Sequence, residues 1–449
     1  MEIFLILFFV ILFIIIATVK FKVHPVFSLV IAALITGGLL GKESGIIVGA
    51  ITEGFGKTLS AIGLIIAFGT VIGAFLERTG GTKVIADSVL KWIGLKRSPL
   101  AMNITGFVIS IPVFCDSGFI ILSSLNKALS KKTGLPVLLF AVSLATGLYT
   151  AHVFIPPTPG PLAAAAVLEA DLGLVFLFGM LVAIPVSLVG YLWARFAGKS
   201  IAHHIEEDDF DELPGKETPP PKTPGYKVTT ISAFLPLVIP ITFIALKSIV
   251  NYPTHPFGEG TIYSILNFVG DPTISLLIGA LLAFNIGRKA SLDERSKWVI
   301  TALKDAGSII LITGAGGAFG NVLRQADIAG LINLDAQMVQ GGILVAFGIA
   351  AILKTAQGSS TVSIITTAAI MAPLLVSLGL DSAMGKTLTV LAIGAGAMTV
   401  SHINDSYFWV VTQFSKMNVK TALRSFTTAT FLQGITALII ILIIQAISG

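Results

Sequence analysis

The stretch that decides the fold runs from Ser98 to Ser124 and reads SPLAMNITGFVISIPVFCDSGFIILSS. It is apolar at both ends, but a proline, a carboxylate and a glycine interrupt its middle, and basic residues flank both sides. One straight span would place one basic cluster outside, against the positive-inside tendency of membrane proteins. Two half-length helices that meet at the interruption keep both clusters inside. We therefore predict a re-entrant hairpin that enters from the cytoplasm, with its tip at residues 111–118, the first tip.

The composition of the whole chain indicates a membrane protein. Of its 449 residues, 54% are hydrophobic and 12% are charged, and the mean hydropathy is +0.92. This is more apolar surface than a soluble domain can bury. Apolar runs such as 4–19 and 431–446 approach the roughly 20 residues that a spanning helix needs. The run 4–19 has no basic segment before it and no cleavage site before Lys20, which predicts a retained helix rather than a signal peptide.

Basic residues between the apolar runs predict the path of the chain, because they gather on the cytoplasmic side. The path is expected to begin outside and to turn at the basic residues that follow the first run. A span at about 25–40 then returns outward, a glycine-rich stretch at 42–57 lies at the interface, and a span at 60–75 runs inward. The basic cluster at 78–97 is the strongest marker of the inner side.

The next apolar run, at 137–166, is interrupted by IPPTPGP at residues 155–161, the first break. Proline removes an amide donor and clashes with the preceding helical turn. Carbonyl groups freed inside a membrane are tolerated only when they are buried in protein or line a wet cavity. A span at 174–193 returns inside, and the long polar stretch at 201–227 is predicted to be a solvated cytoplasmic linker.

The second half repeats this plan with the opposite polarity. Its expected spans lie at 228–250, 274–286, 298–319 and 427–447, and its interrupted runs at 341–376 and 387–412. The first of these runs carries KTAQGSST at residues 354–361, the second tip, and the other carries HIND at residues 402–405, the second break. The second tip fits a hairpin entered from outside, and the C-terminus is expected outside.

The order of spans and breaks predicts an all-α polytopic membrane protein made of two inverted repeats. Each repeat holds about five spanning helices, a re-entrant hairpin and a broken helix. The predicted units are residues 1–200 (scaffold helices about 1–97, hairpin and broken helix about 98–197), the linker 201–227, and residues 228–449 (scaffold helices about 228–338, hairpin and broken helix about 339–449). Paired interruptions in two halves indicate the transport site.

The two tips carry polar groups in apolar surroundings. An ionised carboxylate that faces lipid costs about 2.5 to 3.5 kcal/mol on insertion scales, so Asp116 is expected to face a polar cavity. In the second tip, Gly358, Ser359, Ser360 and Thr361 offer backbone amides and three hydroxyls at the start of a half-helix. Such an arrangement can bind a carboxylate without a buried cation. Plain helix capping is the structural alternative at both tips.

The two breaks carry the remaining candidates. His152 precedes the first break, and His402, Asn404 and Asp405 form the second, so ionisable groups occupy equivalent places in the two halves. A histidine or carboxylate there is a candidate proton carrier, although a hydrogen-bonded structural role is the alternative. The histidine pair in the linker, followed by acidic residues, is a solvated charge run rather than a metal site. The chain has no metalloprotease, esterase or P-loop motif, and its one cysteine, Cys115, excludes a thiolate cluster.

At these same residues the sequence resembles the gluconate:proton symporter (gluconate permease) family. Four motifs carry the resemblance: FCDSGF at 114–119, PPTPGP at 156–161, AQGSSTV at 356–362 and SHINDS at 401–406. The resemblance implies the ion-transporter superfamily fold, with a scaffold domain, a transport domain with two opposed hairpins, a dimeric assembly and elevator-type movement. It also implies proton-driven uptake of gluconate or related aldonates, glycerate or D-serine. Gluconate-transporting relatives commonly carry a histidine where this chain has Thr158, a hydroxyl that cannot carry a proton as imidazole does.

These observations predict a transporter of the bacterial inner membrane, and not an enzyme, with no cofactor, metal or nucleic-acid partner. Its expected partners are a small carboxylate, a proton, the bilayer and a second copy of the chain. The predicted substrate-binding residues are Ser117, Thr158, Ser359, Ser360, Thr361 and Asn404. The predicted candidates for proton coupling are Asp116, His152, His402 and Asp405. Sodium coupling, an intramembrane enzyme and a passive channel are the alternatives.

Overall fold

A computed structural model of the chain describes residues 20–200, 228–250, 260–324, 341–403 and 405–448, with parts of 6–17. Every regular element in these residues is a helix. Six of the described helices are long and apolar enough to cross a membrane, or seven when the bent pair α11 (Thr261–Val269) and α12 (Pro272–Ile286) counts as one span. The prediction of an all-α polytopic membrane protein is confirmed. The predicted linker at 201–227 lies outside the described residues.

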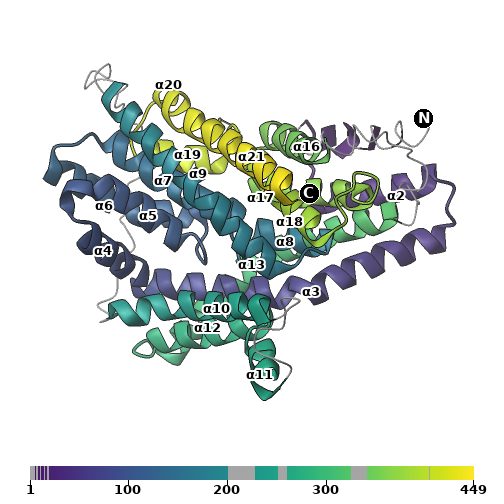
Figure 1. The fold of residues 1–449 in the computed structure, drawn as a ribbon, viewed down its shortest axis with the longest axis horizontal. Helices are drawn as coiled ribbons and strands as arrows, with labels where there is room; N and C mark the ends of the chain where they lie inside the picture. Colours follow the sequence, from purple (N-terminus) through teal and green to yellow (C-terminus); the bar gives the residue numbers. More distant parts are fainter. Residues whose placement is uncertain are drawn as a thin grey trace.

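One layer of helices lies along the lower edge of Figure 1 and contains α3, α10 and α12. The helices of this scaffold layer are α2 (Pro25–Leu39), α3 (Ser44–Thr79), α4 (Gly81–Ile93), α10 (Thr230–Val250), α12 and α13 (Leu292–Arg324). The two longest, α3 and α13, pack against each other, while α2 packs on α13 and α12 packs on α3. Each half of the chain therefore places its shorter helix on the long helix of the other half.

The stretch at 42–57, which was expected at the interface, is continuous with the following span, because the residues from Ser44 to Thr79 form one helix. Among its glycines Gly54 is a packing position, whereas a side chain at Gly45, Gly49 or Gly56 would meet nothing within 4 Å. A side chain at Gly54 would meet the carbonyl oxygen of Gly317 at 2.5 Å, so the two long helices approach closely here. Small residues allow such backbone contact between membrane helices.

Helix α11 lies below α12 in Figure 1, and the helices above the scaffold form a second layer. Its first-half helices are α5 (Ser98–Ile109), α6 (Cys115–Thr133), α7 (Val137–Phe154), α8 (Pro159–Leu168) and α9 (Leu172–Ser200). Its second-half helices are α16 (Gly342–Gln357), α17 (Ser360–Met371), α18 (Ala383–Met398), α19 (Ser406–Phe414), α20 (Val419–Ala422) and α21 (Thr428–Ser448). Each predicted interruption therefore separates two helices.

Contacts in this layer follow the same pattern in the two halves. The first hairpin arms α5 and α16 pack on α7 and α18, respectively. The second arms cross between the halves, because α6 packs on α19 and α17 packs on α8. Each tip therefore lies beside the broken helix of the other half as well as beside its own. The repeat boundaries given above stay predictions.

Buried amides join the helices of this layer. The Asn103 side chain on α5 donates to the carbonyl oxygen of Ser143 at 3.0 Å and accepts from the Ser187 hydroxyl at 2.9 Å. Gln433 on α21 donates to the Thr150 hydroxyl at 2.8 Å. Inside a bilayer no water replaces such partners, so these bonds fix the mutual positions of α5, α7, α9 and α21.

A first prediction concerns the crossing of α5 and α7. A Cβ at Gly147 would lie 2.0 Å from the carbonyl oxygen of Asn103, whereas a Cβ at Gly348 on α16 would meet nothing within 4 Å. We expect Gly147→Ala to lower the free energy of unfolding by about 1 to 3 kcal/mol, because the helices must separate. The matched change Gly348→Ala is expected to be neutral. Thermal unfolding of both purified variants measures this difference, and equal melting temperatures would contradict it.

Candidate functional site

The first tip forms between α5, which ends at Ile109, and α6, which begins at Cys115. The residue that caps α6 is Phe114, which makes no side-chain capping bond, so the capping alternative for Asp116 is wrong. Asp116 instead lies in the first turn of α6, where a carboxylate is favoured by the positive end of the helix dipole. The Cys115 thiol donates to the Asp116 carboxylate at 3.7 Å. Ser117 follows on the same turn and is half-buried.

The first break separates α7 from α8 and presents two predicted residues. His152 is buried near the end of α7, and its Nδ1 atom has no hydrogen-bond partner within the described part of the chain. Its ring lies 6.4 Å from that of Phe114 in the first tip, measured between centroids. The Thr158 hydroxyl donates to the carbonyl oxygen of Ile155 at 2.5 Å, which leaves its lone pairs free to accept.

A cavity of about 300 Å³ lies between the first tip, the first break and the scaffold helix α3. Its walls are formed by Ile66, Gly69, Thr70, Ile111, Pro112, Val113, Phe114, His152, Pro157, Thr158 and Pro159. His152 and Thr158, two of the predicted site residues, therefore border one space. Thr70 adds a third polar side chain, from a helix that the sequence did not assign to the site.

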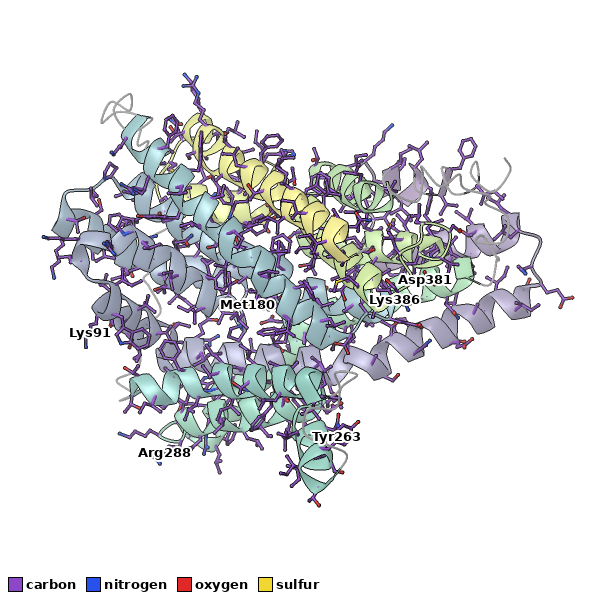
Figure 2. All side chains as sticks on the ribbon, in the orientation of Figure 1. Lys91, Met180, Tyr263, Arg288, Asp381 and Lys386 are labelled. Carbon is purple, nitrogen blue, oxygen red and sulfur yellow. The ribbon has the colours of Figure 1, made fainter. Side chains whose placement is uncertain are left out.

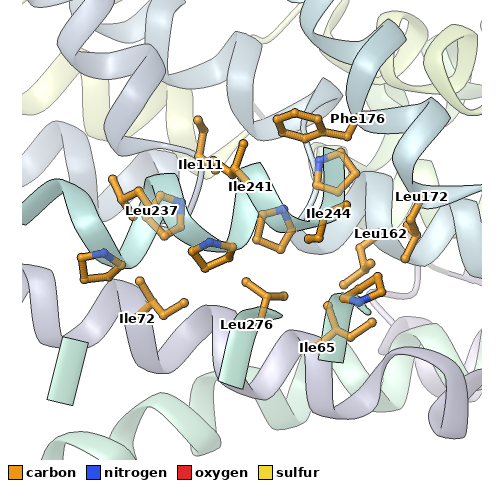
Figure 3. A pocket seen from close by; sticks show the side chains of 16 residues that line it. Ile65, Ile72, Ile111, Leu162, Leu172, Phe176, Leu237, Ile241, Ile244 and Leu276 are labelled. Carbon is orange, nitrogen blue, oxygen red and sulfur yellow. The ribbon is translucent and has the colours of Figure 1, made fainter. Parts of the chain in front are cut away.

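A larger cavity, of about 500 Å³, borders the first and is lined only by apolar residues (Figure 3). Its walls come from α3, α10 and α12 on the scaffold side and from the first tip, the first break, α8 and α9 on the other. Ile111, Pro112 and Pro157 line both cavities. The smaller cavity, which has polar side chains in its wall, therefore adjoins an apolar cavity between the two layers.

The second tip is shorter than predicted. Helix α16 continues through Gln357, so only Gly358 and Ser359 lie between it and α17. Gly358 has a φ of 86°, a backbone conformation that glycine adopts without strain. The Ser359 hydroxyl accepts from the amide of Val362 at 3.3 Å, which confirms helix capping at this residue. Ser360 is buried and interacts with the Tyr149 hydroxyl, and Thr361 is half-buried.

A buried ion pair joins the second tip to the second break. The Lys354 ammonium lies 2.6 Å from a carboxylate oxygen of Asp405, and their side chains are 0% and 5% exposed. The same ammonium donates to the carbonyl oxygen of Gly358. Asp405 accepts from the Ser401 hydroxyl with one oxygen and from the amide of Tyr407 at 3.1 Å with the other.

Lys354 is the candidate site residue that sequence reasoning missed. The second tip was expected to bind a carboxylate without a buried cation, and a buried cation lies directly beneath it. Lys354 was named only as part of the interruption. A lysine inside an otherwise apolar run marks a functional site by itself, since an unpaired charge in a membrane is costly. Its pairing with Asp405, 51 residues away, is visible only in the folded chain.

Four ionisable side chains from both halves gather at this place. Asp116 and His152 each interact electrostatically with Lys354 and with Asp405. His402 has its Nε2 atom 3.2 Å from the carbonyl oxygen of Thr355. Asn404 lies outside the described residues. The site therefore combines two carboxyl groups, one imidazole and one ammonium next to hydroxyls that can bind a carboxylate or a sugar hydroxyl.

Comparisons with known proteins agree with this picture. The chain is 32% identical to the inner membrane permease YgbN of Escherichia coli K12, with 94% of each chain covered. It is 31% identical to a gluconate permease of Pseudomonas aeruginosa (95% of this chain, 94% of the other) and 29% identical to the D-serine transporter DsdX of Escherichia coli K12 (95% of each).

A crystal structure of the YdaH transporter of Alcanivorax borkumensis has a similar fold. The TM-score is 0.62 at 13% identity, with 89% of this chain and 87% of that chain covered. The family model described as GntP family permease matches residues 1–447. Its members are permeases rather than enzymes, in accord with the apolar helices and the buried polar site. The chain belongs to the GntP family of permeases.

Proposed function

We propose that this permease takes up gluconate or a related small hydroxy-carboxylate across the bacterial inner membrane together with a proton. The observation that carries the proposal is the electrostatic cluster of Asp116, His152, Lys354 and Asp405. One of its members, His152, also borders a cavity that Thr70 and Thr158 line with their hydroxyl side chains. Such a site offers groups for an anion and groups for a proton within one protein interior. Gluconate permeases at about 30% identity support the substrate class.

The proposed substrate lies between the two tips. Its carboxylate binds the hydroxyls of Ser117, Ser359, Ser360 and Thr361, and Thr158 and Asn404 recognise its hydroxyl groups. Ser359 supports this role, because its oxygen accepts from the Val362 amide and its proton remains free to donate. Thr158 has the reverse arrangement, since its proton is donated to Ile155 and its oxygen remains free to accept. A carboxylate and a sugar hydroxyl need these two opposite kinds of partner.

The proposed coupling ion is a proton, with Asp116, His152, His402 and Asp405 as candidate carriers. Of these, Asp116, His152 and Asp405 belong to the electrostatic cluster, whereas His402 lies beside the Thr355 carbonyl. Sodium coupling is the alternative on the same fold. Proton-coupled uptake of D-serine or glycerate is a second alternative. The 29% identity to D-serine transporters supports D-serine as the substrate in this alternative.

We further propose an orientation and an assembly. Figure 2 shows Lys91 and Arg288 at one end of the molecule, away from Asp381 and Lys386. Lys91 belongs to the basic cluster at 78–97 that is predicted to mark the inner side, so this end is proposed to face the cytoplasm. Both termini are proposed to lie on the outer side. The scaffold layer forms a homodimer in this proposal. The layer with the tips moves against it along the apolar cavity.

The first test is uptake of labelled gluconate into proteoliposomes under an inward proton gradient. We expect accumulation that stops when the gradient is collapsed. Competition by glycerate, other aldonates, D-serine and lactate then identifies the preferred substrate. Accumulation that requires sodium instead of the proton gradient would favour the sodium alternative, and equilibration without accumulation would favour a channel.

A second prediction tests the hydroxyls of the tips. We expect the variant Ser117→Ala/Ser360→Ala/Thr361→Ala to lose uptake by about 10-fold to 1,000-fold, since three neutral hydrogen bonds contribute about 0.5 to 1.5 kcal/mol each. The matched control removes three exposed hydroxyls that donate to their own helices, in Thr52→Ala/Thr242→Ala/Thr301→Ala. It is expected to transport normally. Wild-type uptake by the tip variant at normal membrane levels would contradict the site.

A third prediction tests the movement between layers. A Cβ at Gly73 on α3 would lie 2.4 Å from the carbonyl oxygen of Pro112 in the first tip, whereas one at Gly63, on the same helix, would meet nothing within 4 Å. We expect Gly73→Ala to displace the tip and to slow uptake several-fold, and Gly63→Ala to leave the rate near that of the wild type. Initial uptake rates at saturating gluconate measure both variants. Equal rates would show that the tip does not seat on α3 during transport.

A further inference from the structure

The buried Lys354–Asp405 ion pair can take part in the transport cycle itself. This role rests on the proposed function, proton-coupled uptake of a carboxylate. Its atoms are 2.6 Å apart and its side chains are 0% and 5% exposed. Removing one partner from such a pair leaves an uncompensated buried charge, whereas neutralising both is tolerated. A pair of this kind inside a membrane protein therefore needs a substitute charge whenever it opens.

The groups that face the pair come from every element packed around it. Asp405 is held by Ser401 and Tyr407 in and after the second break. From α7, the Tyr149 ring lies 5.8 Å from the Lys354 ammonium and His152 interacts with both partners.

On α6, Asp116 also interacts with both Lys354 and Asp405. Its carboxylate accepts a hydrogen bond from the Cys115 thiol. The charged groups facing the pair from these elements are thus one further carboxyl group and one imidazole.

Lys354 lies directly beneath the proposed carboxylate site. Its ammonium donates to the carbonyl oxygen of Gly358, and the next residue, Ser359, is exposed at the surface of the second tip. Ser360, the residue after that, interacts with Tyr149, whose ring faces the same ammonium. A carboxylate bound to the hydroxyls of this tip is therefore adjacent to the only cation of the four-residue cluster.

We propose that Lys354 is the counter-ion of the substrate carboxylate and exchanges its partner during transport. In the empty protein Lys354 pairs with Asp405. When the substrate binds, its carboxylate takes the place of Asp405 at Lys354, and the displaced Asp405 carboxylate accepts the co-transported proton on the oxygen that Lys354 has released. On release the proton leaves Asp405, the substrate leaves Lys354, and the original pair forms again.

Charge balance makes this exchange an obligatory coupling. The empty pair is neutral, and so is the loaded site, in which Lys354 faces the substrate anion and Asp405 is protonated. A proton alone leaves Lys354 as an unpaired cation, and a substrate alone leaves Asp405 as an unpaired anion next to Asp116. Both single-loaded states bury a net charge, which a bilayer penalises. Only the empty and doubly loaded sites are then suited to cross the membrane.

Titration of the purified full-length protein with gluconate tests the exchange. Calorimetry in two buffers of different ionisation enthalpy gives the number of protons bound per substrate. We expect about one proton for the wild type and about none for Asp405→Asn, which keeps binding because asparagine still caps α19 and leaves Lys354 available. Lys354→Gln is expected to bind gluconate about 100-fold more weakly or worse.

Two controls separate structural damage from a loss of function. Lys354→Gln/Asp405→Asn removes both charges, so we expect it to recover any thermal stability lost in Lys354→Gln but not to bind gluconate. Asp271→Asn changes the same atoms in an ion pair of the scaffold, where Asp271 lies 3.1 Å from Lys247, and is expected to behave as the wild type. In proteoliposomes Asp405→Asn is expected to exchange internal for external gluconate but not to accumulate it.

The outcomes separate this proposal from the proposed function. If the wild type binds and transports its substrate without taking up a proton, proton coupling fails and the exchange fails with it. If the wild type takes up a proton and Asp405→Asn still does so, only the exchange is overturned. Full gluconate affinity in Lys354→Gln would likewise overturn the role of Lys354 while leaving proton-coupled uptake intact.

Discussion

The structure depends on how a chain in lipid satisfies the backbone groups that four helix interruptions leave free. Where α5, α7, α16 and α18 end inside apolar runs, their last carbonyls and the first amides of the following helices need partners, and lipid supplies none. The chain meets this need by gathering the interruptions. Each second hairpin arm packs beside the broken helix of the other half, and Lys354 binds the Gly358 carbonyl at the end of α16. The polar interior that results is the place where a transporter can hold its substrate.

Within that interior, the Lys354–Asp405 pair ties the second tip to the second break. The Asp405 carboxylate caps α19, accepts from the Ser401 hydroxyl and neutralises Lys354. The same group therefore sets both the local geometry and the local charge. Asp116 and His152 extend the cluster into the first half. The imidazole also borders the cavity next to Thr158, which links the charged cluster to the space between the layers.

The two layers meet through surfaces of different character. The scaffold helices α3 and α13 approach each other at Gly54 and Gly317, where side chains would collide with backbone, and this contact is close and rigid. Between the layers the walls are proline and aliphatic side chains around a cavity of about 500 Å³. Dispersion contacts are non-directional, so such a surface tolerates displacement better than one made of hydrogen bonds. The fold thus combines a tightly packed scaffold layer with a second layer that contacts it through apolar side chains.

The sequence by itself determined the membrane class and the positions of the interruptions, and it indicated three of the four residues in the ionisable cluster. Apolar run length, proline and glycine act locally, so α2, α10, α12 and α21 begin and end within a few residues of the predicted spans. Motifs at Asp116, His152 and Asp405 were visible for the same reason. Local patterns separated residues 42–57 from the following span, with which residues 44–57 form one helix. Tertiary structure alone decided that Lys354 meets Asp405, that α6 lies on α19, and that Thr70 borders the cavity. These are contacts between distant segments, and the shape of the fold, not the local sequence, sets their distances.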